Sequence, residues 1–226
     1  MALPFSYTVR NLWTRKLTTL LTAGGMALVV FVFAAVQMLD TGLRQTLIAT
    51  GQPDNVHVTR RASGAEISSV VDRMQAAVVE TQPEIAIGGN GLRLASKEVV
   101  VLITLPKRDS GVATNVTTRG VGLAAFELRP QLRIIEGRSF RPGSAEVIVG
   151  SSIAQRFEGA AVGSLLRFGG REWQVVGLFE AKGSAYDSEV WADADQLLQS
   201  FRRNAWSSVV ARLADPAALP EIKSRL

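Results

Sequence analysis

An uninterrupted apolar segment near the N-terminus constrains this chain more than any other feature. Residues 17–39 read LTTLLTAGGMALVVFVFAAVQML and contain no charged side chain. A helix of this length spans roughly 34 Å, which exceeds the roughly 30 Å thickness of the hydrocarbon core of a bilayer. Because lipid offers no hydrogen-bond partners to the backbone, a single segment crosses it as a helix. The sequence therefore predicts a transmembrane helix over 17–39.

Charges beside this segment predict its orientation. Arg10, Arg15 and Lys16 precede it, and no acidic residue occurs before Asp40. Segments rich in lysine and arginine stay on the cytoplasmic side of a membrane. We therefore expect residues 1–16 to form a cytoplasmic or interfacial amphipathic segment at an inner-type cell membrane. The main domain is then extracytoplasmic.

A cleaved signal peptide is the alternative interpretation of the same segment. Its apolar core would be about 7 to 15 residues long, and a small-residue cleavage site would follow. Here the apolar run is longer, and Gln37-Met38-Leu39-Asp40 does not resemble such a site. A retained anchor is the favoured interpretation.

Two further features of the helix bear on its role. An apolar stripe runs on from Val36 to Leu47 before Gly51, which predicts a helical stalk over 40–52. Thr18, Thr22 and Gly25 share one face, and small residues there permit close packing against another helix. The alternative is that the threonine hydroxyls bond to the backbone of their own helix.

The overall charge does not indicate a nucleic-acid partner. The net charge is +5, but three of these charges precede the apolar segment, and the others alternate with acidic residues. A solvated surface of mixed charge is therefore the better interpretation, and no nucleic-acid partner is expected. The chain has no cysteine, which excludes disulfides, thiolate metal sites and cysteine nucleophiles.

Beyond the stalk, patterns typical of strands alternate with patterns typical of helices. The fold class predicted is α+β, with one long N-terminal transmembrane helix followed by a mixed α/β extracytoplasmic domain over 53–226. Gly169-Gly170 separates two apolar segments as in a tight hairpin. Strands are expected at 55–59, 98–105, 113–121, 146–150, 165–168, 172–179 and 206–213, and helices at 66–80, from a capping box at Ser152, from Asp193 and from Pro216.

No set of residues suited to catalysis emerges from the sequence. It contains no phosphate-binding P-loop, no nucleophile elbow and no zinc-binding histidine pair. His57 is the only histidine and alternates with valines, so a structural role is favoured over a catalytic or metal-binding one. Asp193 and Asp195 fit a helix start better than a cation site. We expect no catalytic, cofactor-binding or metal-binding residues.

Two stretches together resemble a known family. Tyr7 to Thr22, with Arg10-Asn11-Leu12 and Lys16 ahead of Leu20-Leu21-Thr22, looks like the start of permease subunits of MacB/FtsX-type ABC transporters. Glu136 to Phe140, Glu146 to Gly150 and Phe168 to Gly177 are similar to their periplasmic core domain.

This resemblance implies two periplasmic subdomains, one formed by 53–122 plus 205–226 and a second inserted over 123–204. The family has three further spans after this domain, and the chain ends within an expected helix that begins at Pro216. If the chain is a fragment, it supplies the first helix and the periplasmic domain. If it is naturally short, the transporter interpretation weakens.

The function implied by the resemblance is that of an ABC transporter permease. It would transmit motion driven by a cytoplasmic ABC ATPase to the periplasmic domain, for export or extraction of a substrate. Implied partners are that ATPase, a second permease in a homodimer or heterodimer, and a membrane-fusion or adaptor protein. The alternative is a single-pass, membrane-anchored periplasmic binding or adaptor module without transport activity.

Overall fold

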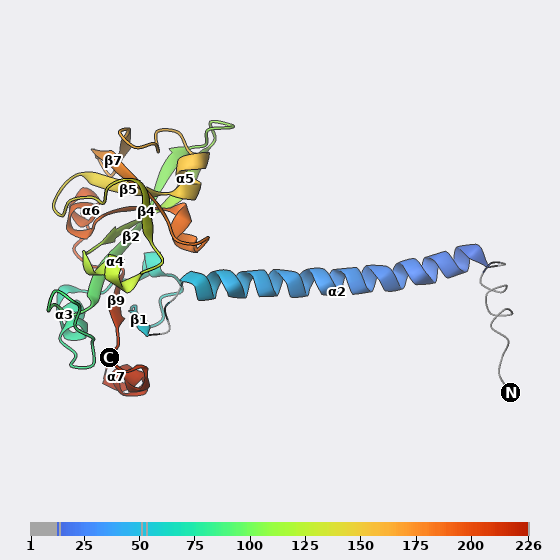
Figure 1. Cartoon of the computed structure of the whole chain (residues 1–226), viewed down its shortest axis with the longest axis horizontal. Coiled ribbons are helices and arrows are strands. Elements are labelled where there is room, and N and C mark those ends of the chain that lie inside the picture. The colour runs from blue at the N-terminus through green and yellow to red at the C-terminus, as the bar shows by residue number, and fades with distance from the viewer. Residues whose placement is uncertain (1–12, 14, 51, 53, 226) are drawn as a thin grey trace. The chain divides into compact units, whose positions relative to one another are not determined.

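The computed structural model describes residues 13, 15–50, 52 and 54–225, without the side chains of 44–50 (Figure 1). Its contacts divide the chain into two units, Met1–Gln45 and Thr46–Leu226. Helix α2 (Lys16–Thr50) forms the described part of the first unit and runs on into the second. Within it, Lys16–Leu43 is long and apolar enough to cross a membrane. The expectation of one N-terminal apolar helix is thereby confirmed.

The second unit contains a mixed sheet. Within the described residues nine strands pair in the order β1-β9-β2-β3-β8-β5-β7-β4, and β6 pairs with β7. The pairs β3–β8 and β5–β7 are parallel, and the others are antiparallel. The strands are β1 (Asn55–Val58), β2 (Ala95–Pro106), β3 (Ala113–Val121), β4 (Arg133–Gly137), β5 (Glu146–Gly150), β6 (Leu165–Phe168), β7 (Arg171–Glu180), β8 (Glu189–Asp193) and β9 (Ser208–Arg212).

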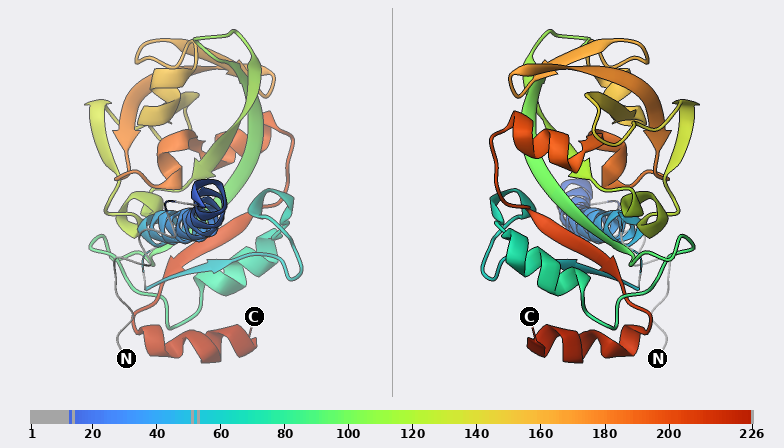
Figure 2. Two further views of the ribbon diagram at one scale, coloured as in Figure 1. Left: turned by 90° about the vertical axis from the view of Figure 1, so that its right-hand side faces the viewer. Right: turned by 90° about the vertical axis from the view of Figure 1, so that its left-hand side faces the viewer.

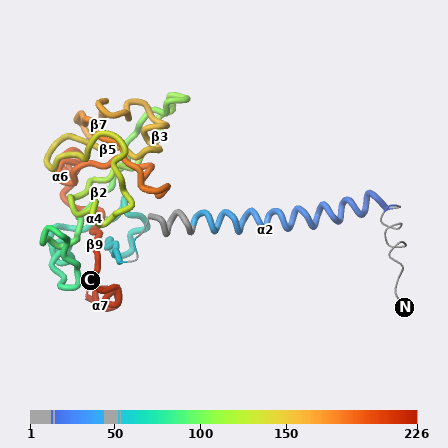
Figure 3. Tube along the Cα trace, viewed as in Figure 1, coloured from blue at the N-terminus to red at the C-terminus, as the bar shows by residue number. Residues whose placement is uncertain are grey.

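The long strand β2 joins two parts of this sheet. Its first residues, 95–98, pair with β9, which also pairs with β1 although it lies far along the chain (Figure 3). Its remaining residues, 99–106, pair with β3 instead. Figure 2 shows β2 and β3, in green, curving away from the part that holds β1 and β9. The partner of β2 therefore changes between Glu98 and Val99.

Short helices pack against the sheet. Helix α6 contacts β2, β3 and β8, α3 contacts β9, and α4 contacts β2 and β9. The helices are η1 (Glu66–Ser68), α3 (Arg73–Glu80), α4 (Ala124–Leu128), α5 (Ser151–Arg156), η2 (Ala185–Ser188), α6 (Ala194–Ser200), η3 (Pro216–Ala218) and α7 (Leu219–Arg225). This α+β arrangement confirms the predicted fold class, whereas the division into 53–122 plus 205–226 and 123–204 stays a prediction.

Strand β5 shows how the sheet is buried on both faces. Val147 and Val149 belong to one apolar cluster, and Ile148 between them belongs to another. Successive side chains of a strand point to opposite faces, so both faces of β5 are covered. Trp173 and Trp191, which are fully buried, anchor the two clusters.

The expected helix over 66–80 is wrong in its first half. Val71 forms a β-bridge with Trp206, and the helix begins only after Asp72. The Asp72 carboxylate accepts a bond from the Gln75 amide while the Gln75 side chain accepts one from the Asp72 amide. This capping box fixes the start, because it satisfies amides that have no partner within the helix.

One capping prediction fails, while one turn prediction and one other cap are confirmed. Helix α5 starts at Ser151 after Gly150, without a side-chain cap, so the box expected at Ser152 is absent. Gly169 and Gly170 join β6 to β7 with φ angles of 58° and 75°, which a two-residue turn requires. Asp193 accepts a bond from the Gln196 amide and caps α6.

Candidate functional site

A buried arginine near the C-terminal end of β3 organises the candidate site. The guanidinium of Arg119 donates from Nε and Nη2 to the two carboxylate oxygens of Glu189, at 2.8 and 2.9 Å. Its Nη1 donates to Glu66 at 2.7 Å and to Glu98 at 3.0 Å. Strand β8 runs parallel to β3 and pairs Glu189 with Thr117, two residues before Arg119. This pairing brings the Glu189 carboxylate within reach of the Arg119 guanidinium. One planar cation thus holds three carboxylates from three elements.

A second arginine completes the arrangement. Arg129, which ends α4, donates from Nη2 to Glu98 at 2.8 Å, and its Nη1 lies 2.7 Å from the other oxygen. Its guanidinium lies over the rings of Tyr186 and Trp191, at 4.9 and 5.3 Å from their centroids. Glu98 is 0% exposed and Arg129 is 2% exposed. Salt bridge and cation–π contact therefore both act where little water screens them.

Glu66 lies at the more open edge of the group. Its carboxylate also accepts a bond from the Ser208 hydroxyl at 2.6 Å and lies 3.1 Å from Nε2 of His57. Burial raises the pKa of Glu66, but the contacts with His57, Arg119 and Ser208 lower it further, so its pKa lies well below the ordinary value. Glu66 is consequently a carboxylate at neutral pH.

We call Glu66, Glu98, Glu189, Arg119 and Arg129 the charge cluster. With His57 neutral, its formal charge is −1, because three carboxylates face two guanidinium groups. Burial lowers the pKa of Arg119, but the carboxylates raise it further, so the guanidinium stays protonated. Removing one partner from such a buried pair leaves an uncompensated charge, which costs about 3–5 kcal/mol.

The charge cluster spans the point where β2 changes its partner. Glu98 is the last residue of β2 that pairs with β9, and Val99 is the first that pairs with β3. On one side of Glu98 the cluster has Glu66 from η1, which also bonds to Ser208 of β9. On the other side it has Arg119 from β3 and Glu189 from β8, and Arg129 follows α4. The ion pairs therefore fasten the two parts of the sheet to each other.

The segment that follows α2 is attached beside this cluster. The Gln52 side chain donates to Oε1 of Gln131 at 3.1 Å, and the Asn55 side chain donates to the Leu128 carbonyl at 2.8 Å. Both acceptors flank Arg129. Within two residues of leaving α2, the chain is thus bonded to the segment that carries one cation of the charge cluster.

A cavity of about 320 Å³ reaches the charge cluster from outside. It is lined by Gln52 and Asn55 from the attached segment, by His57, and by Tyr186 and cluster residues. Water can therefore reach the Glu66 and His57 side of the cluster, while Glu98 stays fully buried. The cluster is thus buried around Glu98 and accessible to solvent at Glu66.

The predicted orientation residues are only partly described. Arg10 lies outside the described residues. Arg15 immediately precedes α2 and Lys16 begins it, with the Lys16 ammonium 4.9 Å from the Trp13 ring centroid. Tryptophan beside lysine at the end of an apolar helix suits a membrane interface. The direction of insertion stays a prediction.

The predicted packing face also stays a prediction. The Thr22 hydroxyl donates to the Thr18 and Thr19 carbonyls at 3.0 and 3.1 Å, so it satisfies itself within its own helix. Among the described residues, no side chain comes within 4 Å of a Cβ built on Gly25. The Thr22 hydroxyl therefore needs no partner on a neighbouring helix.

The structure brings one other predicted residue into the candidate site. His57 lies on β1 against Glu66, which gives it a structural contact. The described residues contain no group of three or more His, Cys, Asp or Glu side chains arranged to hold a metal ion. The candidate site therefore consists of buried ion pairs and of the hydrogen bonds that attach the segment after α2 beside them.

No sequence pattern predicts the charge cluster. Glu98 and Arg119 were placed inside two expected strands, at 98–105 and 113–121, without being assigned a role. A charged residue inside a strand that is otherwise buried was the available signal, because such a residue needs a partner of opposite charge. The sequence does not indicate which partner.

The comparison with known families decides the identity of the domain. The family described as MacB-like periplasmic core domain matches residues 17–226. The chain belongs to this family. The MacB-like domain begins here with the apolar helix and continues through the sheet and the charge cluster. No curated protein matches the chain.

Solved structures share the fold of the MacB-like domain. The periplasmic region of MacB from Actinobacillus actinomycetemcomitans matches with a TM-score of 0.56 at 13% identity, covering 77% of this chain and 82% of that one. The extracellular domain of the noncanonic ABC-type transporter YknZ from Gram-positive bacteria matches with a TM-score of 0.53 at 18% identity, covering 67% and 78%. These likenesses concern the fold.

The suspected relationship to MacB/FtsX-type permeases is thus confirmed at the level of the family. Similar domains belong to transporter permeases, and the chain combines such an extracytoplasmic domain with an apolar helix long enough for a membrane anchor. Coupling to ATP hydrolysis, the identity of partners and the membrane orientation stay predictions.

Replacing Arg119 with methionine tests the stabilising role of the charge cluster. Arg119→Met leaves three carboxylates with too little positive charge, so the free energy of unfolding should fall by about 3–5 kcal/mol. Denaturant unfolding of the purified chain in detergent, followed by tryptophan fluorescence, measures this. Arg167→Met is the control, because the Arg167 side chain is 81% exposed beside Glu172 and should cost less than about 1 kcal/mol. Equal losses would contradict the prediction.

Acid should weaken the domain through two depressed carboxyl groups. The pKa of Glu66 lies well below 4.5, and hydrogen bonds from Arg138 lower the pKa of Glu146 from 4.5 to about 2. Their stabilisation is fully present above pH 4.5 and is lost as pH falls through the folded-state values.

Glu66→Gln and Glu146→Gln should therefore lower the free energy of unfolding at pH 7, and the difference from the unmodified chain should shrink as pH falls from 4.5 towards 2. Denaturant unfolding at pH 7 and pH 3 measures it. Glu136→Gln, at an exposed position of β4, should show no such pH dependence. A difference that persists unchanged at pH 3 would contradict the assignment.

Proposed function

We propose that this chain supplies the first membrane helix and the extracytoplasmic domain of an ABC transporter permease subunit. The subunit transmits motion from a separate cytoplasmic ATPase to its extracytoplasmic domain, for export or extraction of a substrate. The observation that carries this proposal is the family match over residues 17–226, which includes both the apolar helix and the domain. The match to MacB in fold supports it.

The apolar helix is the element through which motion enters the domain. In the proposed orientation Arg15 and Lys16 stay at the cytoplasmic face of an inner membrane, and Thr46–Leu226 lies on the periplasmic side. Residues 17–39 cross the bilayer and 40–52 form a stalk. A continuous helix is stiff, so a shift of its membrane-spanning part reaches Thr50 without being absorbed by a loop.

The attached segment and the charge cluster pass this shift to the sheet. Gln52 and Asn55 bond to the residues on either side of Arg129, and Arg129 bonds to Glu98 on β2. A displaced helix therefore moves both parts of the sheet together. We expect the division into 53–122 plus 205–226 and an inserted 123–204 to describe the bodies that β2 and the cluster couple.

A second permease copy is the proposed neighbour of the helix, in a homodimer or heterodimer. Thr18, Thr22 and Gly25 form the face that would pack against it, because small side chains let two backbones approach closely. A membrane-fusion or adaptor protein is a further proposed partner of the extracytoplasmic domain. The chain itself is proposed to lack enzymatic activity, with ATP hydrolysis in the separate subunit.

Single cysteines can test the orientation, because the chain has none of its own. Asp109→Cys, on an exposed loop, should react with an impermeant maleimide applied outside the inner membrane. Ala2→Cys should react only after that membrane is broken, because the cations after it hold the N-terminus inside. Gel shift of the labelled chain measures both. The opposite pattern would contradict the orientation.

Affinity purification of the native protein from membranes tests the function. We expect an ATPase with a phosphate-binding P-loop to co-purify, because the chain carries no nucleotide-binding motif. Mass spectrometry of the eluate identifies it, with an unrelated tagged membrane protein as the control. Repeated recovery without any nucleotide-binding protein would favour the anchored adaptor module.

The same complex tests the transmission path. Gln52→Ala with Asn55→Ala should keep the ATPase bound but lose the nucleotide-dependent change in protease sensitivity of the extracytoplasmic domain. Thr104→Ala is a matched control, because the Thr104 hydroxyl donates to the neighbouring Asn115 on an exposed part of the sheet. An undiminished response in the double variant would reject this path.

A further inference from the structure

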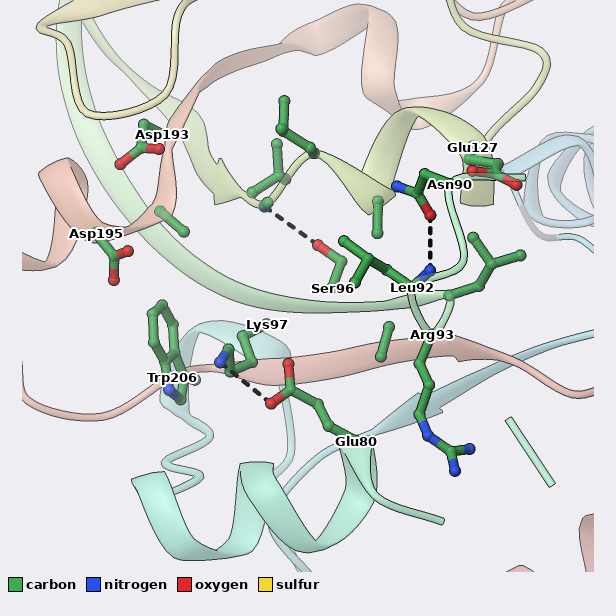
Figure 4. A pocket seen from close by; sticks show the side chains of 17 residues that line it. Glu80, Asn90, Leu92, Arg93, Ser96, Lys97, Glu127, Asp193, Asp195 and Trp206 are labelled. Atoms are coloured by element: carbon green, nitrogen blue, oxygen red, sulfur yellow. Dashed lines mark hydrogen bonds and ion pairs between the residues drawn. The ribbon is translucent and has the colours of Figure 1, made fainter. Parts of the chain in front are cut away.

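A second cavity, of about 510 Å³, lies apart from the charge cluster (Figure 4). Its walls come from the loop before β2, from β2 itself, and from the starts of α4 and α6. Cavities of this size accommodate a small organic molecule. Neither the family match nor the transmission path assigns it a role.

Apolar side chains line this cavity, and two of them are left in solvent. Leu92 and Leu123 are 67% and 64% exposed, whereas Leu94, Val121 and Trp206 are buried beneath them. Asn90 fixes the position of Leu92, since its side-chain oxygen accepts a bond from the Leu92 amide at 3.0 Å. Exposed leucines held in a concave surface mark a place where apolar atoms can be buried.

Carboxylates stand at opposite ends of the same cavity. Figure 4 shows Asp193 and Asp195 at one end and Glu127 at the other. Within the described part of the chain, no arginine, lysine or histidine forms an ion pair with any of the three. The Asp193 carboxylate accepts the capping bond from the Gln196 amide. Negative charge at both ends is therefore left without a counter-charge.

The two cations that line the cavity do not balance these carboxylates. Lys97 pairs with Glu80 at 3.2 Å and lies over the Trp206 ring, 5.6 Å from its centroid. Arg93 donates to the Gln82 carbonyl at 2.5 Å, on the side away from Glu127. Counting Glu80, four carboxylates and two cations line the cavity, so its lining has a formal charge of −2, which favours a cationic ligand.

The glycine-rich loop holds Glu127 at its end of the cavity. A Cβ on Gly88 would lie 2.8 Å from the end of the Leu94 side chain and 2.9 Å from the Glu127 carboxylate, so the loop passes close to both side chains. The Gly89 amide donates to that carboxylate at 3.4 Å. The loop thus contacts Glu127 through a neutral donor and leaves its charge in place.

We propose that this cavity binds a linear organic cation with amino groups at both ends of an apolar body. Its ends would meet Asp193 and Asp195 on one side and Glu127 on the other, and its body would cover Leu92 and Leu123. Charge complementarity selects a dication over a neutral or anionic molecule of the same length. The proposal is separate from the transmission path, because binding needs no ATPase.

Calorimetric titration of the full chain in nanodiscs of zwitterionic phosphatidylcholine tests this, with octamethylenediamine as the probe. We expect saturable binding that weakens as salt screens the carboxylates. Octanediol, which has the same length without charge, should bind at least about tenfold more weakly. Tetramethylenediamine should also bind more weakly, since each buried methylene contributes up to about fourfold in affinity.

Charge-neutral variants identify the site. Glu127→Gln and Asp195→Asn keep the size of each side chain and should each weaken octamethylenediamine binding by about fivefold. Glu136→Gln, an exposed carboxylate on β4, is the matched control and should bind as the unmodified chain does. Unchanged melting temperatures would show that the variants are folded.

Three outcomes would overturn the proposal. These are absence of saturable diamine binding, equal affinity for octanediol, and diamine affinity that Glu127→Gln and Asp195→Asn leave unchanged. None of them bears on whether an ATPase co-purifies, so failure of this site and failure of the transporter assignment are distinguishable.

Discussion

The structure depends on the interaction between the Arg119 guanidinium and three carboxylates. Arg119 is 7% exposed, and a charge in that position is tolerable only when its donors are matched. Glu189 takes two of them, and Glu66 and Glu98 share a third nitrogen. An apolar contact would allow the two parts of the sheet to slide. This planar, directional contact permits one arrangement, which makes it suited to fixing the junction at β2.

This junction explains how one apolar helix can act on a whole domain. A strand that changes partners midway is a natural place for bending, because no single row of hydrogen bonds crosses the change. The charge cluster crosses it, and the segment after α2 is bonded next to Arg129 through Gln52 and Asn55. In the proposed permease, force applied by the helix would therefore be delivered at the point where the sheet changes partners, and it would move both parts.

Features that depend on residues close in sequence could be predicted, whereas contacts between residues distant in sequence could not. Three features depend on residues that are near one another in the sequence. They are the apolar helix, the Gly169-Gly170 turn and the Asp193 cap. The ion pairs of Arg119 join residues 21, 53 and 70 positions apart, and nothing in a strand pattern selects those partners. The helix expected over 66–80 failed for the same reason, since its first half is held by a bridge to Trp206.

The charge cluster and the proposed dication cavity share their supporting elements. Strand β2 carries Lys97 to the cavity and Glu98 to the cluster, and α4 with its end carries Glu127 and Arg129 in the same way. Neighbouring positions on a rigid element cannot shift independently. A ligand that draws Glu127 towards itself would therefore act on Arg129 and, through the Leu128 carbonyl, on Asn55. Under both proposals, an occupied cavity would thus be linked through these bonds to the segment that follows α2.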